Sequence, residues 1–154
     1  MPCSKWTAIF SHNPDDLLRL TAELEAGADV AVGSRYSKGV TVVNWPMSRL
    51  LMSYCASRYV RIVTGMPVCD ATAGFVGYKR EVLAAIDFDR IEMVGYGFQI
   101  EMKYTAWKMG FRIGEVPIIF ADRTEGTSKM SGGIFGEAFF GVLALPFRTI
   151  ARKK

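Results

Sequence analysis

The sequence predicts an α/β fold in which helices alternate with short apolar strands. The chain has 154 residues, which is the size of one domain and enough to bury a core. Half of the residues are hydrophobic and 22% are charged, which is typical of a folded chain and argues against disorder. Short apolar runs that end at glycine indicate strands, and apolar residues at helical spacing indicate helices.

The first two expected elements are a helix and a buried strand. Asn13 is suited to cap a helix, Pro14 fits its first turn, and the two acidic residues that follow favour the positive end of its dipole. Leucines at helical spacing come next, and Gly27 is a natural stop. Residues 29–33 are short, apolar and closed by glycine, which predicts a buried parallel strand.

A long helix is expected to begin at Pro46 and to end near Gly65. Its apolar residues form one stripe, which comprises Met47, Leu50, Leu51, Tyr54, Cys55, Tyr59, Ile62 and Val63. The remaining pattern predicts strands at 71–78 and 113–120, helices at 80–86 and 96–109, and an apolar helix at the end. Pro117 indicates an edge strand or a bulge.

The charge is distributed unevenly along the chain. A net charge of +4 is too small to indicate a nucleic-acid-binding protein. A basic end follows the last apolar segment and favours an anionic membrane surface; it comprises Arg148, Arg152, Lys153 and Lys154. No apolar run reaches the length of a membrane span, and no signal pattern opens the chain.

Cysteine spacing indicates the cellular compartment. Cys3, Cys55 and Cys69 are unevenly spaced and form no CxxC pair, so we expect reduced thiols in a cytosolic protein, two of them in the core. The chain also lacks G-x-G-x-x-G and G-x-x-x-x-G-K-[ST]. A nucleotide-binding sheet normally opens with a strand and such a turn, whereas here a helix is expected almost at once.

Seven segments in order resemble the polyprenol (dolichol) phosphate mannose synthases of glycosyltransferase family 2. They are FSHNPDDL at 10–17, GSRY at 33–36, NWPMSR at 44–49, DATAGF at 70–75, GYGFQIE at 95–101, EVP at 115–117 and RTEGTSKM at 123–130. Each segment alone is a weak signal. Their common order over residues 10–132 makes the resemblance specific.

The resemblance implies a fold and a reaction. Residues 1–132 would form the acceptor-side part of a GT-A-type, Rossmann-like glycosyltransferase domain without its N-terminal nucleotide-binding half. Residues 133–154 would form an apolar helix with a basic end. Members of the family invert the sugar as they move a hexose, usually mannose from GDP-mannose, onto a membrane polyprenyl phosphate, with Mg²⁺ or Mn²⁺ stabilising the leaving group.

The resemblance also implies partners and a location. The partners would be a polyprenyl (dolichyl) phosphate, a sugar nucleotide, a membrane surface, and a second copy or a separately encoded N-terminal half. We therefore expect a cytoplasmic protein that is peripheral to the inner face of the membrane. The terminal helix could lie in the membrane interface, or pack against its own domain or a second copy.

Thr7 and Ile9 depart from the family pattern, because they stand where the family carries Asp-x-Asp. Neither residue supplies a carboxylate for a hard cation, so no metal ligand is expected there. We expect a truncated chain that is inactive alone. The alternatives are a relative of the undecaprenyl phosphate glycosyltransferases, and a non-catalytic remnant or subunit that binds phosphate or membrane.

Two residues of the long helix suit a phosphate. Arg49 and Ser53 are four positions apart and share a face, so a forked cation and a hydroxyl would lie side by side. The resemblance implies that Arg35 and Arg123 complete an acceptor-phosphate site with them. Arg35 could instead form a structural salt bridge with an aspartate, either 29 or 70.

Candidate residues also occur in a polar loop and near the donor side. Arg123 and Lys129 flank a glycine, which suits either a cationic lid or an exposed charged loop. The resemblance implies that Asp70 faces the donor, although it could instead cap the turn that follows. We expect Glu101 to be the second catalytic residue, and a solvated helix glutamate is its alternative.

Overall fold

The computed structural model describes residues 3–4, 15–121 and 132–153. In this part of the chain a four-stranded sheet has the order β1–β4–β2–β5. Its strands are β1 (Cys3–Ser4), β2 (Val30–Ser34), β4 (Val76–Tyr78) and β5 (Ile113–Pro117). β2 runs parallel to β5 and antiparallel to β4, which also pairs antiparallel with β1. A two-stranded parallel sheet joins β3 (Val42–Val43) to β6 (Phe120–Ala121).

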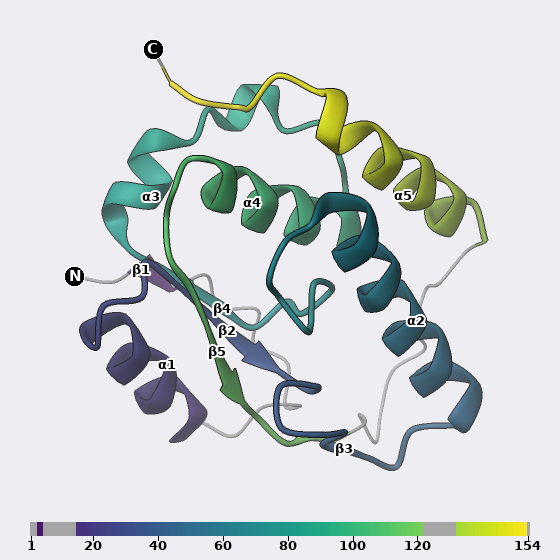
Figure 1. Cartoon of the computed structure of the whole chain (residues 1–154). Coiled ribbons are helices and arrows are strands. Elements are labelled where there is room, and N and C mark those ends of the chain that lie inside the picture. Colours follow the sequence, from purple (N-terminus) through teal and green to yellow (C-terminus); the bar gives the residue numbers. More distant parts are fainter. Residues whose placement is uncertain (1–2, 5–14, 122–131, 154) are drawn as a thin grey trace.

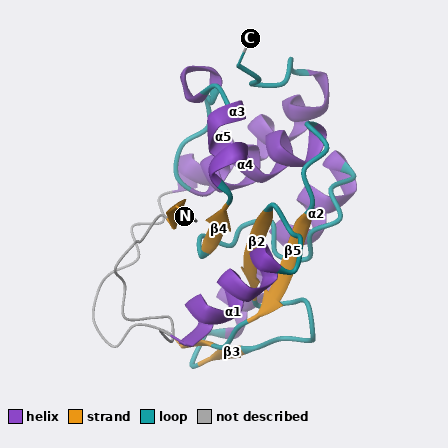
Figure 2. Cartoon of the chain, turned by 90° about the vertical axis from the view of Figure 1, so that its left-hand side faces the viewer, coloured by secondary structure: helices purple, strands orange, loops and turns teal. Residues whose placement is uncertain are grey.

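Helices cover both faces of the larger sheet (Figures 1 and 2). They are α1 (Asp15–Glu25), α2 (Met47–Thr64), α3 (Arg80–Ala85), α4 (Tyr96–Lys108) and α5 (Gly132–Ala144), with 3-10 turns η1 (Phe88–Arg90) and η2 (Leu145–Phe147). α1 lies on one face, α3 and α4 lie on the other, and α5 contacts α2 and α4. The predicted mixed α/β class is therefore confirmed.

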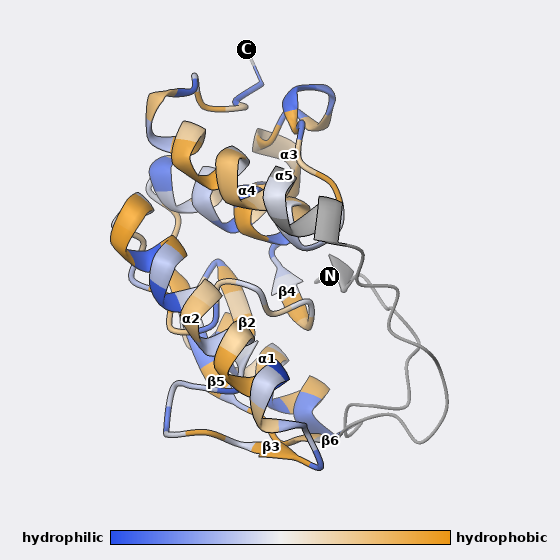
Figure 3. Ribbon diagram, turned by 90° about the vertical axis from the view of Figure 1, so that its right-hand side faces the viewer, coloured by the Kyte–Doolittle hydropathy of each residue, from blue (hydrophilic) through white to orange (hydrophobic). Residues whose placement is uncertain are grey.

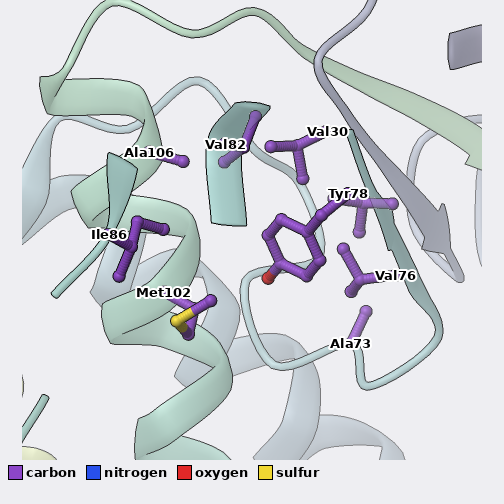
Figure 4. Close-up of a cluster of buried hydrophobic side chains, with 9 residues drawn as sticks. Val30, Ala73, Val76, Tyr78, Val82, Ile86, Met102 and Ala106 are labelled. Carbon is purple, nitrogen blue, oxygen red and sulfur yellow. The ribbon is translucent and has the colours of Figure 1, made fainter. Parts of the chain in front are cut away.

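The central strand β2 is buried on both faces, as its apolar run predicts. Val30 and Val32 point into the cluster on the α3–α4 side, which also contains Tyr78, Val82 and other side chains shown in Figure 4. Ala31 points the other way, into a cluster with leucines of α1. This alternation of side chains fixes the register of β2. Ser34, the last residue of the strand, and Arg35 after it therefore lie at the site.

Two sequence-based expectations about elements were wrong. The strand expected at 71–78 is present only as Val76–Tyr78, because the residues before it form a turn that side chains hold in place. The apolar stripe of α2 is mostly at the surface, whereas Ser57, Val60 and Thr64 face inward. Pro117 does lie on an edge strand, β5, as predicted.

The cysteines and the C-terminal residues also differ from expectation. Cys55 and Cys69 are free, as predicted, but Cys55 is exposed and Cys69 is only partly buried, so neither is a core residue. Arg148 does not project freely, because it forms ion pairs with Glu92 (3.0 Å) and Glu101 (3.8 Å). The backbone of the following segment bonds to residues 85–87, which ties the end of the chain to α3.

Candidate functional site

A buried arginine–aspartate pair lies directly after the central strand. The carboxylate of Asp70 accepts hydrogen bonds from Nε and Nη2 of Arg35, both at 2.6 Å, and from its backbone N–H at 3.0 Å. The Asp70 side chain is fully buried and that of Arg35 is 11% exposed. Burial opposes the charge of Arg35, but the hydrogen bonds and charge of Asp70 outweigh it and raise the pKa of the guanidinium. The structural salt bridge considered from the sequence is thus present, with Asp70 as the partner.

Charged side chains from two further elements hold the turn that contains Asp70. Glu115 of β5 accepts hydrogen bonds from the backbone N–H groups of Cys69 (2.9 Å) and Asp70 (3.0 Å). Lys103 of α4 donates to the carbonyl of Ala73 at 2.6 Å. The Asp70 turn, residues 69–73, is therefore fixed by β5, α4 and the segment after β2, and not by backbone ladder bonds alone.

Lys103 is completely buried. Desolvation lowers its pKa to about 7, with Asp70 and Glu115 acting in the opposite direction and Arg35 reinforcing the decrease. Four charged groups form a compact cluster of balanced charge. They are the cations of Lys103 and Arg35 and the carboxylates of Asp70 and Glu115. The ammonium group of Lys103 donates to the carbonyl of Ala73, so it is directed at the Asp70 turn.

The start of α2 lies beside Arg35. The guanidinium carbon of Arg49 is 4.3 Å from the ring centre of Trp45, and that of Arg35 is 5.3 Å from the same ring. Ser53 accepts a hydrogen bond from the hydroxyl of Tyr36 at 2.9 Å. Burial raises the pKa of Tyr36, although the Ser53 bond and Arg35 counteract it. Two cations and a hydroxyl are thus gathered at the carboxyl end of β2.

The structure brings four of the predicted site residues together. Arg35, Arg49 and Ser53 are linked through Trp45 and Tyr36, and Asp70 is bonded directly to Arg35. Arg123 and Lys129, expected in the acceptor loop, lie outside the described residues, as do Thr7 and Ile9. The assignment of individual catalytic and phosphate-binding roles to these residues stays a prediction.

Glu101 is held in a different environment from Asp70. Its carboxylate accepts hydrogen bonds from the backbone N–H groups of Glu92 (3.1 Å) and Met93 (2.8 Å) and pairs with Arg148. It is buried, so it is not the solvated helix glutamate of the alternative interpretation. These contacts anchor the segment before α4, and a catalytic role for Glu101 stays a prediction.

The described residues do not fit the divalent cation that the resemblance implies. No group of three or more His, Cys, Asp or Glu that could hold a metal occurs among residues 3–4, 15–121 and 132–153. Both carboxylate oxygens of Asp70 are already engaged by Arg35, which makes it a poor ligand for a hard cation.

Three residues of the site have roles that sequence reasoning missed. Trp45 belongs to the segment at 44–49, but the sequence did not indicate that it lies against two guanidinium groups. Glu115 belongs to a motif that we noted, but its position on the next parallel strand was needed to show that it reaches residues 69 and 70. Lys103 gave no signal, since a lysine in a helix is normally solvated.

Many residues of α2 and α5 are apolar (Figure 3), and the exposed ones give the two helices an apolar surface. The two helices meet where the rings of Tyr59 and Phe139 stack at 4.6 Å. We call this the α2–α5 surface; its exposed members are Met47, Leu51, Met52, Tyr54, Ile62, Phe139, Phe140, Leu143 and, just after α5, Phe147. Such a collection of large apolar side chains indicates a contact surface. The expected division of the chain into an acceptor-side part, residues 1–132, and a C-terminal apolar helix with a basic end, residues 133–154, stays a prediction.

No helix in the described part of the chain is both long and apolar enough to cross a bilayer. No family model matches the chain, but curated proteins do. The polyprenol monophosphomannose synthase of Mycolicibacterium smegmatis is 48% identical over 132 residues, 86% of this chain and 50% of the relative. The undecaprenyl-phosphate mannosyltransferase of Micrococcus luteus is 48% identical over 132 residues, 86% of this chain and 54% of the relative. The dolichol-phosphate mannosyltransferase of Pyrococcus furiosus is 33% identical over 127 residues, 81% of this chain and 35% of the relative.

These relatives carry the names of sugar-transferring enzymes, and their similarity extends over more than four fifths of this chain. The class of protein to which the fold and the site belong is therefore that of the glycosyltransferases. Within this class the chain is similar to the polyprenol phosphate mannosyltransferases, as the ordered motifs predicted. The chain spans about half the length of the first two curated relatives and 35% of the third.

Proposed function

We propose that this chain provides the acceptor side of an inverting mannosyltransferase and binds the phosphate of a polyprenyl monophosphate. The observation that carries the proposal is the convergence of Arg35, Arg49 and Ser53 at the carboxyl end of β2. Open α/β sheets place ligands at this end of their strands. The α2–α5 surface beside it offers apolar contacts for the lipid that carries the phosphate.

The residues contribute in different ways. Arg49 and Ser53 supply charge-assisted and neutral hydrogen bonds to the phosphate oxygens. Arg35 adds positive charge from a fixed position, because two of its nitrogens already donate to Asp70. Asp70 thereby positions Arg35, and its expected role toward the donor remains part of the proposal. Arg123 and Lys129 follow β6 in the sequence and would add cations to the same phosphate.

The donor side lies outside the described residues in this proposal. The sugar nucleotide, GDP-mannose, and its Mg²⁺ or Mn²⁺ would bind to a GT-A nucleotide-binding half outside the described residues. The greater length of the relatives supports this assignment. All three relatives are named for mannose, which does not favour a glucosyltransferase. A non-catalytic phosphate-binding subunit is the alternative that experiments must separate.

Binding of a short prenyl phosphate tests the acceptor site. The purified chain is expected to bind farnesyl phosphate in detergent, measured by calorimetry, and to bind farnesol much more weakly. Arg49→Gln should weaken binding about 10- to 100-fold, because a charge-assisted hydrogen bond contributes roughly 1.5–3 kcal/mol. Arg58→Gln is the matched control, since Arg58 is an exposed arginine on the same helix.

The outcomes separate the candidate functions. Equal binding of farnesol and farnesyl phosphate, or no effect of Arg49→Gln, would contradict the acceptor site. Mannose transfer from GDP-mannose is expected only when the nucleotide-binding half of a relative is added to the chain. Phosphate binding without transfer under those conditions would favour the non-catalytic subunit.

The proposal includes a peripheral position at the cytoplasmic face of the membrane, with the α2–α5 surface toward the lipid. Phe140→Asp and Phe147→Asp should each reduce sedimentation with anionic phospholipid vesicles at least several-fold, because these rings are 70% and 91% exposed and would bury apolar area in the bilayer. Leu18→Asp is the control, since Leu18 is equally exposed, at 70%, but lies on α1 beyond the sheet. Equal losses in all three variants would argue against a specific lipid-facing surface.

A further inference from the structure

Trp45 has contacts that a core tryptophan would not need. Two guanidinium groups lie over its ring, that of Arg49 at 4.3 Å and that of Arg35 at 5.3 Å. The edge-to-face partner of the indole is Phe120, with ring centres 5.4 Å apart. The indole N–H is buried and has no hydrogen-bond partner within the described part of the chain. The ring thus packs through its π system, and its polar atom does not anchor it.

The backbone around Trp45 is built to hold the ring in this place. Asn44 has a φ of 61° and is the sole residue other than glycine with positive φ among residues 3–4, 15–121 and 132–153. Asparagine tolerates this left-handed conformation, which turns the chain between β3 and α2. Pairing of β3 with β6 brings Val42 opposite Phe120, so the aromatic partner of Trp45 arrives on the neighbouring strand.

The arrangement holds two like charges close to one ring. Arginine cations repel each other, and the negative face of an indole attracts each of them. Arg35 is held in place by Asp70, and the guanidinium of Arg49 is the one that lies closer to the indole ring. A side chain that keeps guanidinium groups together in this way prepares a site for a doubly charged anion.

We infer that Trp45 is a positioning residue for the acceptor phosphate, acting by holding the guanidinium of Arg49 against its indole face. The inference rests on the proposed acceptor function and adds a residue to it. Trp45 itself does not need to touch the phosphate. Its effect on binding should therefore disappear when Arg49 no longer carries a charge.

A double-mutant cycle with farnesyl phosphate tests this dependence. Trp45→Leu should weaken binding about 2- to 30-fold, the range that a cation–π contact supports, whereas Trp45→Phe should restore most of the affinity because it keeps an aromatic face. In the Arg49→Gln background, Trp45→Leu should cost little further affinity. Trp107→Phe is the control, since Trp107 lies on α4 against Lys108 and Tyr104.

Each outcome decides between the proposals. Equal losses from Trp45→Leu with and without Arg49→Gln would overturn the inference while leaving the acceptor function intact. No phosphate-dependent binding by the unaltered chain would overturn both. Trp45→Met provides a second, flexible replacement if Trp45→Leu does not fold. As an independent readout, farnesyl phosphate should change tryptophan fluorescence in Trp107→Phe but to a much smaller extent in Trp45→Phe.

Discussion

The Lys103→Met variant is expected to be more stable than the unaltered chain at neutral pH. Lys103 is fully buried, and its pKa is about 7 instead of 10.5, which corresponds to a cost of roughly 5 kcal/mol for the charged form. Methionine fills similar space without charge. It also leaves the carbonyl of Ala73 without its donor, which costs about 1–3 kcal/mol. The net gain is expected to be about 2–4 kcal/mol.

The gain should depend on pH in one direction. Because the pKa of Lys103 is lower in the folded protein than in the unfolded chain, the unfolded chain binds more protons between pH 7 and about 10.5. The contribution of Lys103 to stability therefore rises with pH across this window and is at its least favourable below pH 7. The advantage of Lys103→Met should be largest at or below pH 7 and should vanish toward pH 10.

Urea unfolding at several pH values measures this difference. Lys108→Met is the control, because Lys108 is exposed at the end of the same helix, and its free energy of unfolding should change by less than about 0.5 kcal/mol. A Lys103→Met variant that is less stable than the unaltered chain at pH 7, or a stability difference that does not vary with pH, would contradict the expected cost of burying the charge.

Arg35→Met is expected to have the opposite effect and to destabilise the fold by about 3–5 kcal/mol. The Asp70 side chain is fully buried, so removal of Arg35 leaves a carboxylate without the cation that donates to both of its oxygens. Loss of the pair also frees the turn that the pair orders. Arg58→Met, on the exposed side of α2, serves as the control for loss of an arginine.

A second substitution should recover much of this loss. Asp70→Asn removes the stranded charge and keeps one oxygen, which can accept from the backbone N–H of residue 35, while its amide nitrogen can donate to the hydroxyl of Thr72. The Arg35→Met/Asp70→Asn double variant should therefore be more stable than Arg35→Met alone, as measured by urea unfolding. Equal or lower stability of the double variant would show that the pair acts through shape and not through charge.

The sequence was sufficient to predict the elements whose signals are local. The helix ending at Gly65, the buried strand before Arg35 and the edge position of Pro117 all follow from capping, periodicity or the chemistry of proline. The motif order was sufficient to predict the family. These signals depend on residues that lie within a few positions of each other in the chain.

The interactions that build the site are not local, and so the sequence could not rank them. Asp70 and Arg35 are 35 positions apart, and Glu115 reaches residues 45 and 46 positions before it. The sequence left two aspartates as partners for Arg35, and only the sheet register selects Asp70. A buried lysine is also contrary to the usual fate of a helix lysine, so no periodicity would have indicated Lys103.

The pairing of β3 with β6 has a consequence for the entropy of binding. This pairing joins the segment that carries Trp45 to the strand that carries Phe120. Thr41 adds two hydrogen bonds, because its hydroxyl donates to the carbonyl of Ile118 and its carbonyl accepts from the N–H of Phe120. The connection between β3 and α2 and the segment that follows β5 would otherwise fluctuate independently. The pairing orders them together before any ligand binds. A phosphate that binds there does not have to immobilise them, so more of its contact free energy remains as affinity.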